Sequence, residues 1–299
     1  MHGFILVDKP RGPSSFEVLR KLNKRFNLGH SGHKIGHGGT LDPMASGLLV
    51  VAIGKATRLL RFFLGSDKRY TATLQFGMQT RTLDAEGEIV ARAPYAHITP
   101  ADVGRALRDF RGTILQTPPD FSALHVDGKR AYDLARKGIE VQIPPREITI
   151  HAIEIIDCGL PDTPALTLDI ACSGGTYIRA IARDLGRALH SEAHLTALRR
   201  TGACHFDLSQ ARPLQEILDL PDLASVLTPC AKALGFLPAL PASHDDIRRL
   251  LDGRPVDFHP PTPGIYRIQT PDGILHAVLT HTPDRDDFVR LPLLSTENP

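Results

Sequence analysis

The clearest periodic pattern in the chain lies between Tyr70 and Phe76. Apolar side chains occupy every second position there, and Thr71, Thr73 and Gln75 separate them. Successive side chains of a β-strand point to opposite faces, so this alternation predicts a half-buried strand. Unbroken apolar runs predict buried strands at Gly3–Val7 and Leu48–Ile53, and a mainly apolar segment predicts another strand around Leu166–Ala171. The second of these runs equally fits a short helix that leads into a strand.

Helical signals alternate irregularly with these strands. Ser14 and Glu17 have the spacing of a capping box, which predicts a helix that begins there. Residues 56–64 also have a helical pattern, and after Tyr177 the apolar side chains fall on one helical stripe, at Ile178, Ile181, Ala182 and Leu185. Since strands and helices follow no regular β–α–β order, we expect an α+β fold with a mixed or antiparallel sheet flanked by helices.

Two segments interrupt this organisation. Residues 117–147 have prolines at both ends and a turn signal at Asp127–Gly128, which predicts an insert. Its basic side chains include Lys129, Arg130, Arg136 and Lys137. Residues 237–243, LPALPAS, have the composition of a linker, and beyond them the pattern predicts a helix at 245–251 and strands at 264–269 and 274–280. We therefore expect a large domain over 1–236 and a small domain over 240–299.

Composition is that of an ordinary globular protein. Hydrophobic residues make up 42% of the 299 residues and charged residues 23%, and no stretch reaches the roughly 20 apolar residues of a membrane span. The N-terminal apolar run is too short for a signal peptide. The four cysteines form no CxxC pair, so neither a disulfide framework nor a zinc site is indicated. A cytoplasmic location is the simplest expectation.

Positive charge is concentrated toward the N-terminus, although the whole chain carries only +2. Residues 1–80 contain 12 Lys and Arg against 4 Asp and Glu, whereas the remaining 219 residues contain 23 against 29. Such asymmetry indicates a surface that faces a polyanion. The alternative is that these basic side chains are simply exposed to solvent on the protein surface and bind no polyanion.

A single acid, Asp42, lies in the glycine-rich stretch GHGGTLDPMASGLL, residues 36–49. Glycine permits sharp bends and the close approach of another group to the backbone. Because Pro43 follows, Asp42 could instead be an ordinary helix N-cap with proline at the first helical position. Three histidines precede it, at His30, His33 and His37. Their stretch is not expected to be helical and no nearby acid or cysteine completes a ligand set, so a metal site is disfavoured.

Tyr70 and Arg179 each admit two interpretations. Tyr70 opens the alternating strand on its apolar face, so it is either a core residue or a ring that lines a pocket. Arg179 lies near the start of a helix, where a cation opposes the helix dipole, so it is either exposed to solvent or paired with an anion. The chain has no P-loop, no GxGxxG after a strand and no nucleophile elbow, so no nucleotide cofactor is indicated. These residues alone leave the reaction open.

Six stretches together resemble the TruB-type tRNA pseudouridine synthases, and they occur in the order of that family. They are GFILVDKPRGPSS (3–15), GHGGTLDPMASGLLVVAIGKATRL (36–59), KRYTATLQFGMQTRTLDAEGEIV (68–90), QTPPDFSALHVDGKRAYDLARKGI (116–139), CSGGTYIRAIARDLG (172–186) and AHLTALRRTG (193–202). The resemblance spans about residues 3–210, and the ordered set is far more specific than any single stretch.

The resemblance implies an enzyme that isomerises uridine to pseudouridine at position 55, in the T-loop of tRNA, without a metal or cofactor. It implies that Asp42 is the catalytic carboxylate and that Arg179 keeps it ionised and oriented. Tyr70 resembles the ring that stacks on the flipped base. Further substrate contacts are implied for His37, Leu198, Lys9, Lys129 and Arg130.

Two departures from the family pattern lie in the insert. The family commonly has YSALK where this chain has FSALH, so Phe121 replaces a tyrosine and His125 a lysine. Histidine is mostly neutral at pH 7, so one phosphate contact is expected to be weaker. Residues 240–299 occupy the place of the family's RNA-binding PUA-like domain. They contain 6 basic against 9 acidic residues, which predicts a minor role in RNA binding.

We expect a stand-alone monomer that binds the T-arm of tRNA, with no obligatory protein partner and no membrane association. One alternative is an RNA-binding or tRNA-folding protein with incidental turnover. Others are a synthase for another RNA, a synthase directed by a guide RNA and partner proteins, and a metal-dependent hydrolase built on the histidines. Asp42, Tyr70 and Arg179 together favour the enzyme, because a pure binder would not need all three.

Overall fold

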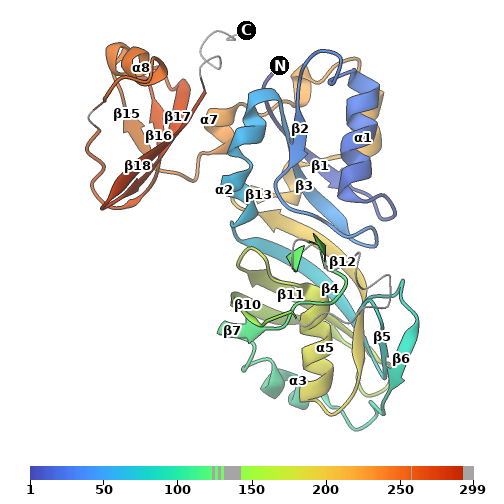
Figure 1. The fold of residues 1–299 in the computed structure, drawn as a ribbon. Coiled ribbons are helices and arrows are strands. Elements are labelled where there is room, and N and C mark those ends of the chain that lie inside the picture. The colour runs from blue at the N-terminus through green and yellow to red at the C-terminus, as the bar shows by residue number, and fades with distance from the viewer. Residues whose placement is uncertain (123–124, 127–128, 131–142, 257, 292–299) are drawn as a thin grey trace.

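A mixed sheet of ten strands forms the centre of the protein (Figure 1). The computed structural model describes residues 1–122, 125–126, 129–130, 143–256 and 258–291. Across the sheet the strands are β14 (Arg212–Pro213), β1 (Gly3–Lys9), β3 (Ser46–Ile53), β12 (Ala193–Ala203), β4 (Lys68–Phe76), β11 (Ala165–Cys172), β10 (Arg146–Cys158) and β7 (Gly112–Gln116), with β2 (Ile35–His37) beside β3 and β13 (Phe206–Asp207) beside β12. Two pairs, β1 with β14 and β3 with β12, are parallel and the others antiparallel, which confirms the predicted α+β fold with a mixed sheet.

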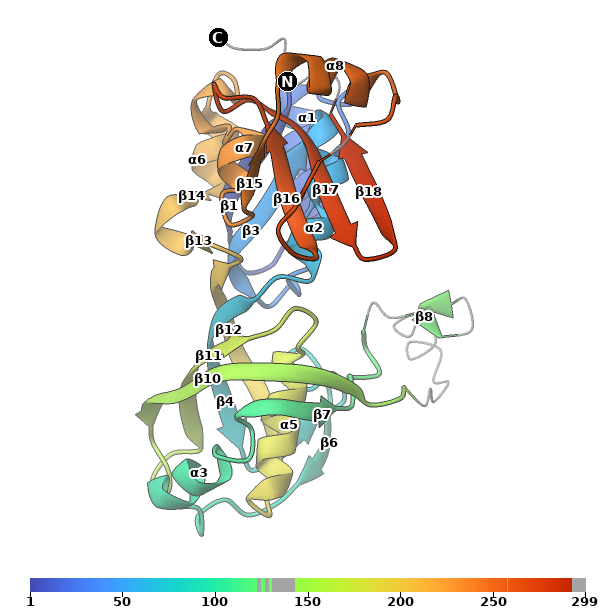
Figure 2. The ribbon, with the colours of Figure 1, turned by 90° about the vertical axis from the view of Figure 1, so that its left-hand side faces the viewer.

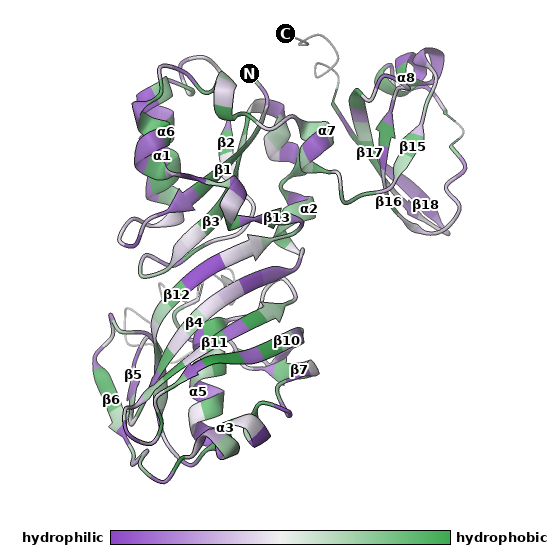
Figure 3. Cartoon of the chain, turned by 180° about the vertical axis from the view of Figure 1, so that it is seen from behind, coloured by the Kyte–Doolittle hydropathy of each residue, from purple (hydrophilic) through white to green (hydrophobic). Residues whose placement is uncertain are grey.

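The strand predicted from the alternating pattern lies near the middle of this sheet. In β4 the side chains of Tyr70, Ala72, Leu74 and Phe76 are buried, and the residues between them are partly exposed. The register with β12 places Tyr70 opposite Arg200. Hydrophilic residues interrupt both β4 and β12 (Figure 3). The two strands therefore bring polar groups into an otherwise apolar sheet.

Helices pack against this sheet, except the last, which packs against a second, C-terminal sheet. They are α1 (Ser15–Phe26), α2 (Arg61–Leu64), α3 (Pro100–Ala106), α5 (Ile178–Ala188), α6 (Leu214–Asp219), α7 (Cys230–Ala233) and α8 (His244–Leu251). The capping box predicted for α1 is confirmed, since Ser14 and Glu17 exchange hydrogen bonds. The segment predicted as one helix over 56–64 is a 3₁₀ turn, Gly54–Leu59, followed by α2. Every helix in the described residues is too short or too polar to traverse a lipid bilayer.

The predicted insert contains a short two-stranded ribbon that stands away from the sheet (Figure 2). Its strands β8 (His125–Val126) and β9 (Lys129–Arg130) pair antiparallel around the predicted turn. The turn itself, the side chains of the two strands and residues 131–142 lie outside the described part. A second ribbon, β5 (Met78–Thr80) with β6 (Ile89–Arg92), follows β4.

The C-terminal residues form a separate four-stranded sheet with α8. Its strands are β15 (Ala239–Pro241), β16 (Gly264–Gln269), β17 (Leu275–Thr282) and β18 (Arg285–Arg290). Because β15 pairs with β16, the stretch predicted as a linker is part of this sheet. Leu275, Val278 and Val289 share one apolar cluster with Phe4 and Phe63 of the large sheet region. The two units therefore share part of their core. The domain boundary expected between residues 236 and 240 stays a prediction.

Candidate active site

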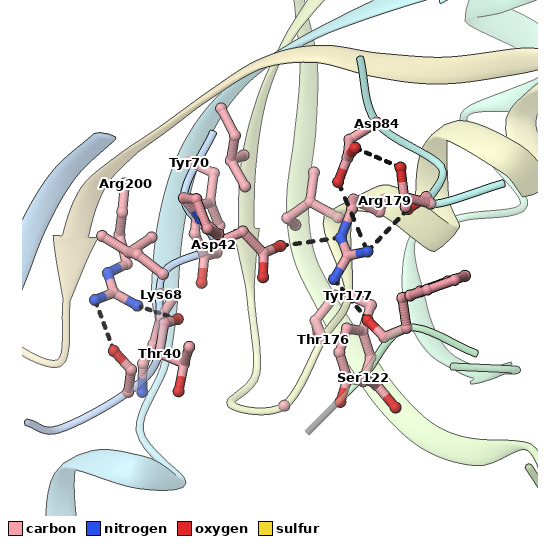
Figure 4. A pocket seen from close by; sticks show the side chains of 18 of the residues that line it. Thr40, Asp42, Lys68, Tyr70, Asp84, Ser122, Thr176, Tyr177, Arg179 and Arg200 are labelled. Atoms are coloured by element: carbon pink, nitrogen blue, oxygen red, sulfur yellow. Dashed lines mark hydrogen bonds and ion pairs between the residues drawn. The ribbon is translucent and has the colours of Figure 1, made fainter. Parts of the chain in front are cut away.

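A cavity of about 680 Å³ lies beside the middle of the large sheet (Figure 4). Four segments that are far apart in sequence line it, together with side chains of β4 and β12. The sheet contributes Lys68, Tyr70, Leu198 and Arg200, and β10 adds Arg146. The segments contribute residues 39–43, Thr82, Asp84, Glu86, residues 121–122 and residues 175–179, and Leu64 completes the lining.

Asp42 lies in a turn and not at the start of a helix. The N–H of Ala45 donates to the Asp42 carbonyl at 3.1 Å, and the chain then continues into β3. The interpretation of Asp42 as a helix N-cap is therefore wrong. Ser15 fixes the loop, because its Oγ donates to the Leu41 carbonyl at 3.0 Å and accepts from the Leu41 N–H at 2.8 Å. The carboxylate is free of capping, is 34% exposed and lines the cavity.

Arg179 is buried against Asp42, with Nε 2.9 Å from Oδ2. The interpretation of Arg179 as solvent-exposed is wrong, and the ion pair that the resemblance implies is present. Its Nη1 donates to the Thr82 carbonyl at 2.8 Å and its Nη2 to the Phe121 carbonyl at 3.0 Å. Each of the three guanidinium nitrogens thus has an oxygen partner, so the orientation of Arg179 relative to Asp42 is fixed.

Asp84 is a second acid of the site, which the sequence did not single out. Its Oδ2 lies 3.8 Å from Nη1 of Arg179, and the residue is buried. The Thr82 hydroxyl and the Glu86 N–H donate to its Oδ1. In the sequence, only its position in the loop after the Tyr70 strand could have indicated that Asp84 belongs to the site. Arg179 therefore lies between two carboxylates, and Asp42 is the more exposed of them.

Tyr70 combines the two interpretations that the sequence left open. It is 9% exposed and packs in the main apolar core, yet it also lines the cavity. Burial raises the pKa of its phenol, and Arg200 opposes that shift through its charge and a side-chain hydrogen bond. The phenol therefore stays protonated at neutral pH and presents both a ring and an O–H group.

Arg200 and Lys68 are two buried cations that sequence reasoning missed. Arg200 donates from Nε to the Leu48 carbonyl at 2.7 Å and from Nη2 to the Gly39 carbonyl at 3.1 Å. It therefore ties β3 to the loop that carries Asp42. Lys68 donates to carbonyls at the end of α2, at Phe63, Leu64 and Ser66. Burial lowers the pKa of Lys68 to about 8. The available signals were a second arginine in TALRR and a lysine two residues before Tyr70.

Lys9 is buried and absent from the cavity lining, so the structure does not support the predicted contact with substrate. The residue is fully buried, and its Nζ donates to the carbonyls of Pro10 at 3.0 Å and Pro13 at 2.7 Å. The Pro43 carbonyl lies 3.5 Å away. Burial is the main reason that its pKa falls to about 8. Lys9 is instead a positioning residue under the Asp42 loop.

Of the other residues predicted to contact substrate, one lines the cavity, one lies outside its lining, and two have side chains outside the described part. Leu198 is buried and lines the cavity. His37 lies on β2, outside the cavity lining, where its Nδ1 is 3.4 Å from the N–H of Gly39. Burial, assisted by the charge of Arg200, lowers the pKa of His37. Lys129 and Arg130 have a described backbone in β9, but their side chains lie outside the described part.

The histidines do not assemble a metal site within the part of the chain that the structure describes. No three His, Cys, Asp or Glu side chains converge there in a way that could hold an ion. The Nε2 of His33 lies 3.3 Å from the N-terminal amine.

Comparison with known proteins identifies similar chains. The profile of the TruB family pseudouridylate synthase N-terminal domain matches residues 25–178, and that of the tRNA pseudouridylate synthase B C-terminal domain matches residues 179–234. The tRNA pseudouridine synthase B of Trichormus variabilis is 41% identical over 275 residues, 90% of each chain. That of Mycobacterium ulcerans is 40% identical over 278 residues, 93% of this chain and 90% of its own. A chain in the crystal structure of a Cbf5-Nop10-Gar1 complex is 26% identical with a TM-score of 0.72, and the match covers 94% of this chain and 78% of that one.

Proposed function

This chain belongs to the TruB family of pseudouridylate synthases and forms pseudouridine in tRNA, and we propose that its target is the uridine at position 55, in the T-loop. The N1–C1′ bond breaks, the base turns, and a C5–C1′ bond forms. The hydrogen on C5 leaves as a proton and N1 gains one, so no oxidant, reductant or added group is needed.

A uridine inside folded RNA has to leave its stack before a side chain can reach its sugar or base. The cavity of about 680 Å³ is large enough to admit one nucleotide, and Tyr70 and Leu198 supply apolar walls for a uracil ring. The Tyr70 ring stacks on the base, and its protonated hydroxyl is available for a hydrogen bond or proton transfer. Both walls lie on adjacent strands, so their spacing is rigid.

Asp42 is the group that acts on the nucleotide. Its carboxylate can attack C1′, attack C6 of the base, or accept the proton from C5, and each role requires an oxygen aimed at the bound uridine. The observation that supports this role of Asp42 is the 2.9 Å contact between Arg179 and Asp42 Oδ2. This contact fixes one oxygen and leaves the other facing the cavity. Pre-set electrostatic contacts of this kind lower barriers without reorganisation during the reaction.

Tritium release from tRNA transcripts that carry 5-tritiated uridine tests the proposal. Wild type is expected to release one tritium per tRNA, and Asp42→Asn none, while both bind the tRNA. A transcript with cytidine in place of the uridine at position 55 should release no tritium above background. The assay contains the purified chain alone, so turnover also shows whether a protein partner or guide RNA is needed.

Two results would overturn the proposal. Release from the cytidine-55 transcript equal to that from the normal transcript would place the target elsewhere. Tight tRNA binding without release from either transcript would instead favour an RNA-binding or tRNA-folding protein.

A further inference from the structure

The cavity has unpaired polar groups that the proposed chemistry does not use. Within the described residues, six buried side-chain nitrogen or oxygen atoms have no hydrogen-bond partner, and two of them belong to residues that line this cavity. They are Oγ of Ser122 and Nε of Arg146. A buried polar group without a partner is destabilising, so a ligand that supplies the missing hydrogen bond binds more tightly.

Ser122 is 3% exposed and follows Phe121, whose carbonyl accepts from Arg179. It is drawn with Thr176 and Tyr177 on the Arg179 side of the cavity, away from Arg200 (Figure 4). Its hydroxyl can donate one hydrogen bond, and no acceptor for it exists among the described residues. The side chain therefore suits an oxygen of a bound molecule.

Arg146 brings a positive charge to the same wall. It is half-buried, its guanidinium carbon lies 4.7 Å from the centre of the Tyr177 ring, and it donates to the Gly175 carbonyl. No carboxylate of the described residues lies within ion-pair distance of it. Stacking on Tyr177 holds the guanidinium plane fixed, while its charge has no counterion among the residues that the structure describes. Arginine fixed in this way is suited to phosphate, which takes two of its N–H groups at once.

We propose that Ser122 and Arg146 form a subsite for a backbone phosphate of the RNA, next to the flipped nucleotide. The inference rests on the proposed function, because only an RNA strand that enters the cavity brings a phosphate to this wall. A flipped base draws its own backbone toward the protein, so one flanking phosphate has to lie at the mouth of the cavity. The subsite would hold that phosphate while Asp42 acts on the sugar or base.

The test measures binding of RNA hairpins to the Asp42→Asn protein, in which turnover is absent. One hairpin has normal linkages, and two others carry a neutral methylphosphonate on the 5′ or the 3′ side of the target uridine. Arg146→Gln and Ser122→Ala are each expected to weaken binding of the normal hairpin about tenfold. One of the two methylphosphonates should weaken binding to a similar degree, and should cost nothing further in Arg146→Gln.

Arg108→Gln is the matched control, because it removes one exposed charge outside the cavity lining. Arg146→Lys keeps the charge without the fork and should recover part of the affinity. The subsite would be overturned if each methylphosphonate weakened RNA binding by the same factor in Arg146→Gln as in the protein with Arg146. It would also be overturned if Arg108→Gln and Arg146→Gln lost equal affinity for the normal hairpin. Because only binding is measured, these results are independent of whether Asp42 carries the chemistry.

Discussion

Four cations are buried around the cavity, and each is held largely by backbone carbonyls: Lys9, Lys68, Arg179 and Arg200. A buried charge is costly unless it is well hydrogen-bonded. Carbonyl oxygens satisfy these N–H groups, and Arg179 in addition pairs with the carboxylates of Asp42 and Asp84. The residues therefore do two things at once, since they fix the loops around Asp42 and leave a positive environment for an RNA phosphate and a carboxylate.

Arg179→Ala is expected to lower single-turnover tritium release by about two orders of magnitude, because Asp42 loses the contact that aims it. Arg179→Lys should recover little, since one ammonium cannot reproduce three edges of a guanidinium. Binding of tRNA should change much less than the rate. Arg187→Ala, an exposed arginine in the last turn of α5, serves as the control. Equal rates in Arg179→Ala and Arg187→Ala would contradict the positioning role.

Lys9 makes the free energy of unfolding depend on pH. Its pKa is about 8 when folded and 10.5 in its ordinary environment, so the unfolded chain binds more protons between these values. Stability should therefore rise as the pH increases from about 8 to 10.5, by up to about 3 kcal/mol from this group. Urea denaturation across this range compares wild type with Lys9→Met. Lys68 contributes the same slope to both proteins, so a slope that is unchanged in Lys9→Met would contradict the assignment.

At the scale of elements, the site depends on how β3 and β12 meet. They run parallel where Gly47 lies opposite Arg200, and Gly47 has a φ of +103°. A Cβ there would be 2.3 Å from the Arg200 carbonyl oxygen. The absence of a side chain lets the two backbones approach closely, and this approach aims Arg200 back toward the Asp42 loop.

Gly47→Ala is accordingly expected to destabilise the protein by about 2 kcal/mol or more, through strain at positive φ and displacement of β12. Gly104→Ala is the matched control, because a Cβ at Gly104 in α3 meets nothing within 4 Å. That change should stabilise the protein by about 0.5–1 kcal/mol. Urea denaturation measures both. Equal effects of the two substitutions would show that the close approach of β3 and β12 is unimportant.

At the scale of the whole molecule, charge is divided between two units that share part of a core. The first 80 residues, which include α1 and the Asp42 loop, hold the excess of basic side chains, whereas residues 240–299 are acidic. The C-terminal sheet nevertheless contributes Leu275 and Val278 to the cluster around Phe63. The C-terminal unit therefore stabilises the fold through this shared core, whereas its acidic composition does not favour phosphate binding.

This division predicts where the salt dependence of tRNA binding originates. Removal of the exposed charge of α1 with Lys24→Gln should reduce the slope of log affinity against log salt by about 0.7–0.9 if one phosphate contact is lost. Arg249→Gln in α8 should leave the slope unchanged. Titrations at several salt concentrations measure both. A larger change for Arg249→Gln would move the RNA surface to the C-terminal unit.

The sequence by itself determined the features that depend on local order. The alternation in β4, the capping box of α1, the apolar stripe of α5 and the family-typical motifs are all readable along the chain, and the structure and comparisons confirm them. It also singled out Asp42, Tyr70 and Arg179 as candidates, but their roles came only from the resemblance. Local rules failed at Asp42, because an Asp-Pro pair fits a turn as well as a helix start.

Only the tertiary structure decided what surrounds these residues. Tyr70 and Arg200 are 130 positions apart and meet because β4 and β12 pair in one register. Lys9 is basic and close to a motif, yet its ammonium is enclosed by backbone carbonyls. No sequence period records such contacts, because burial and hydrogen-bond partners are set by segments that fold together from distant positions.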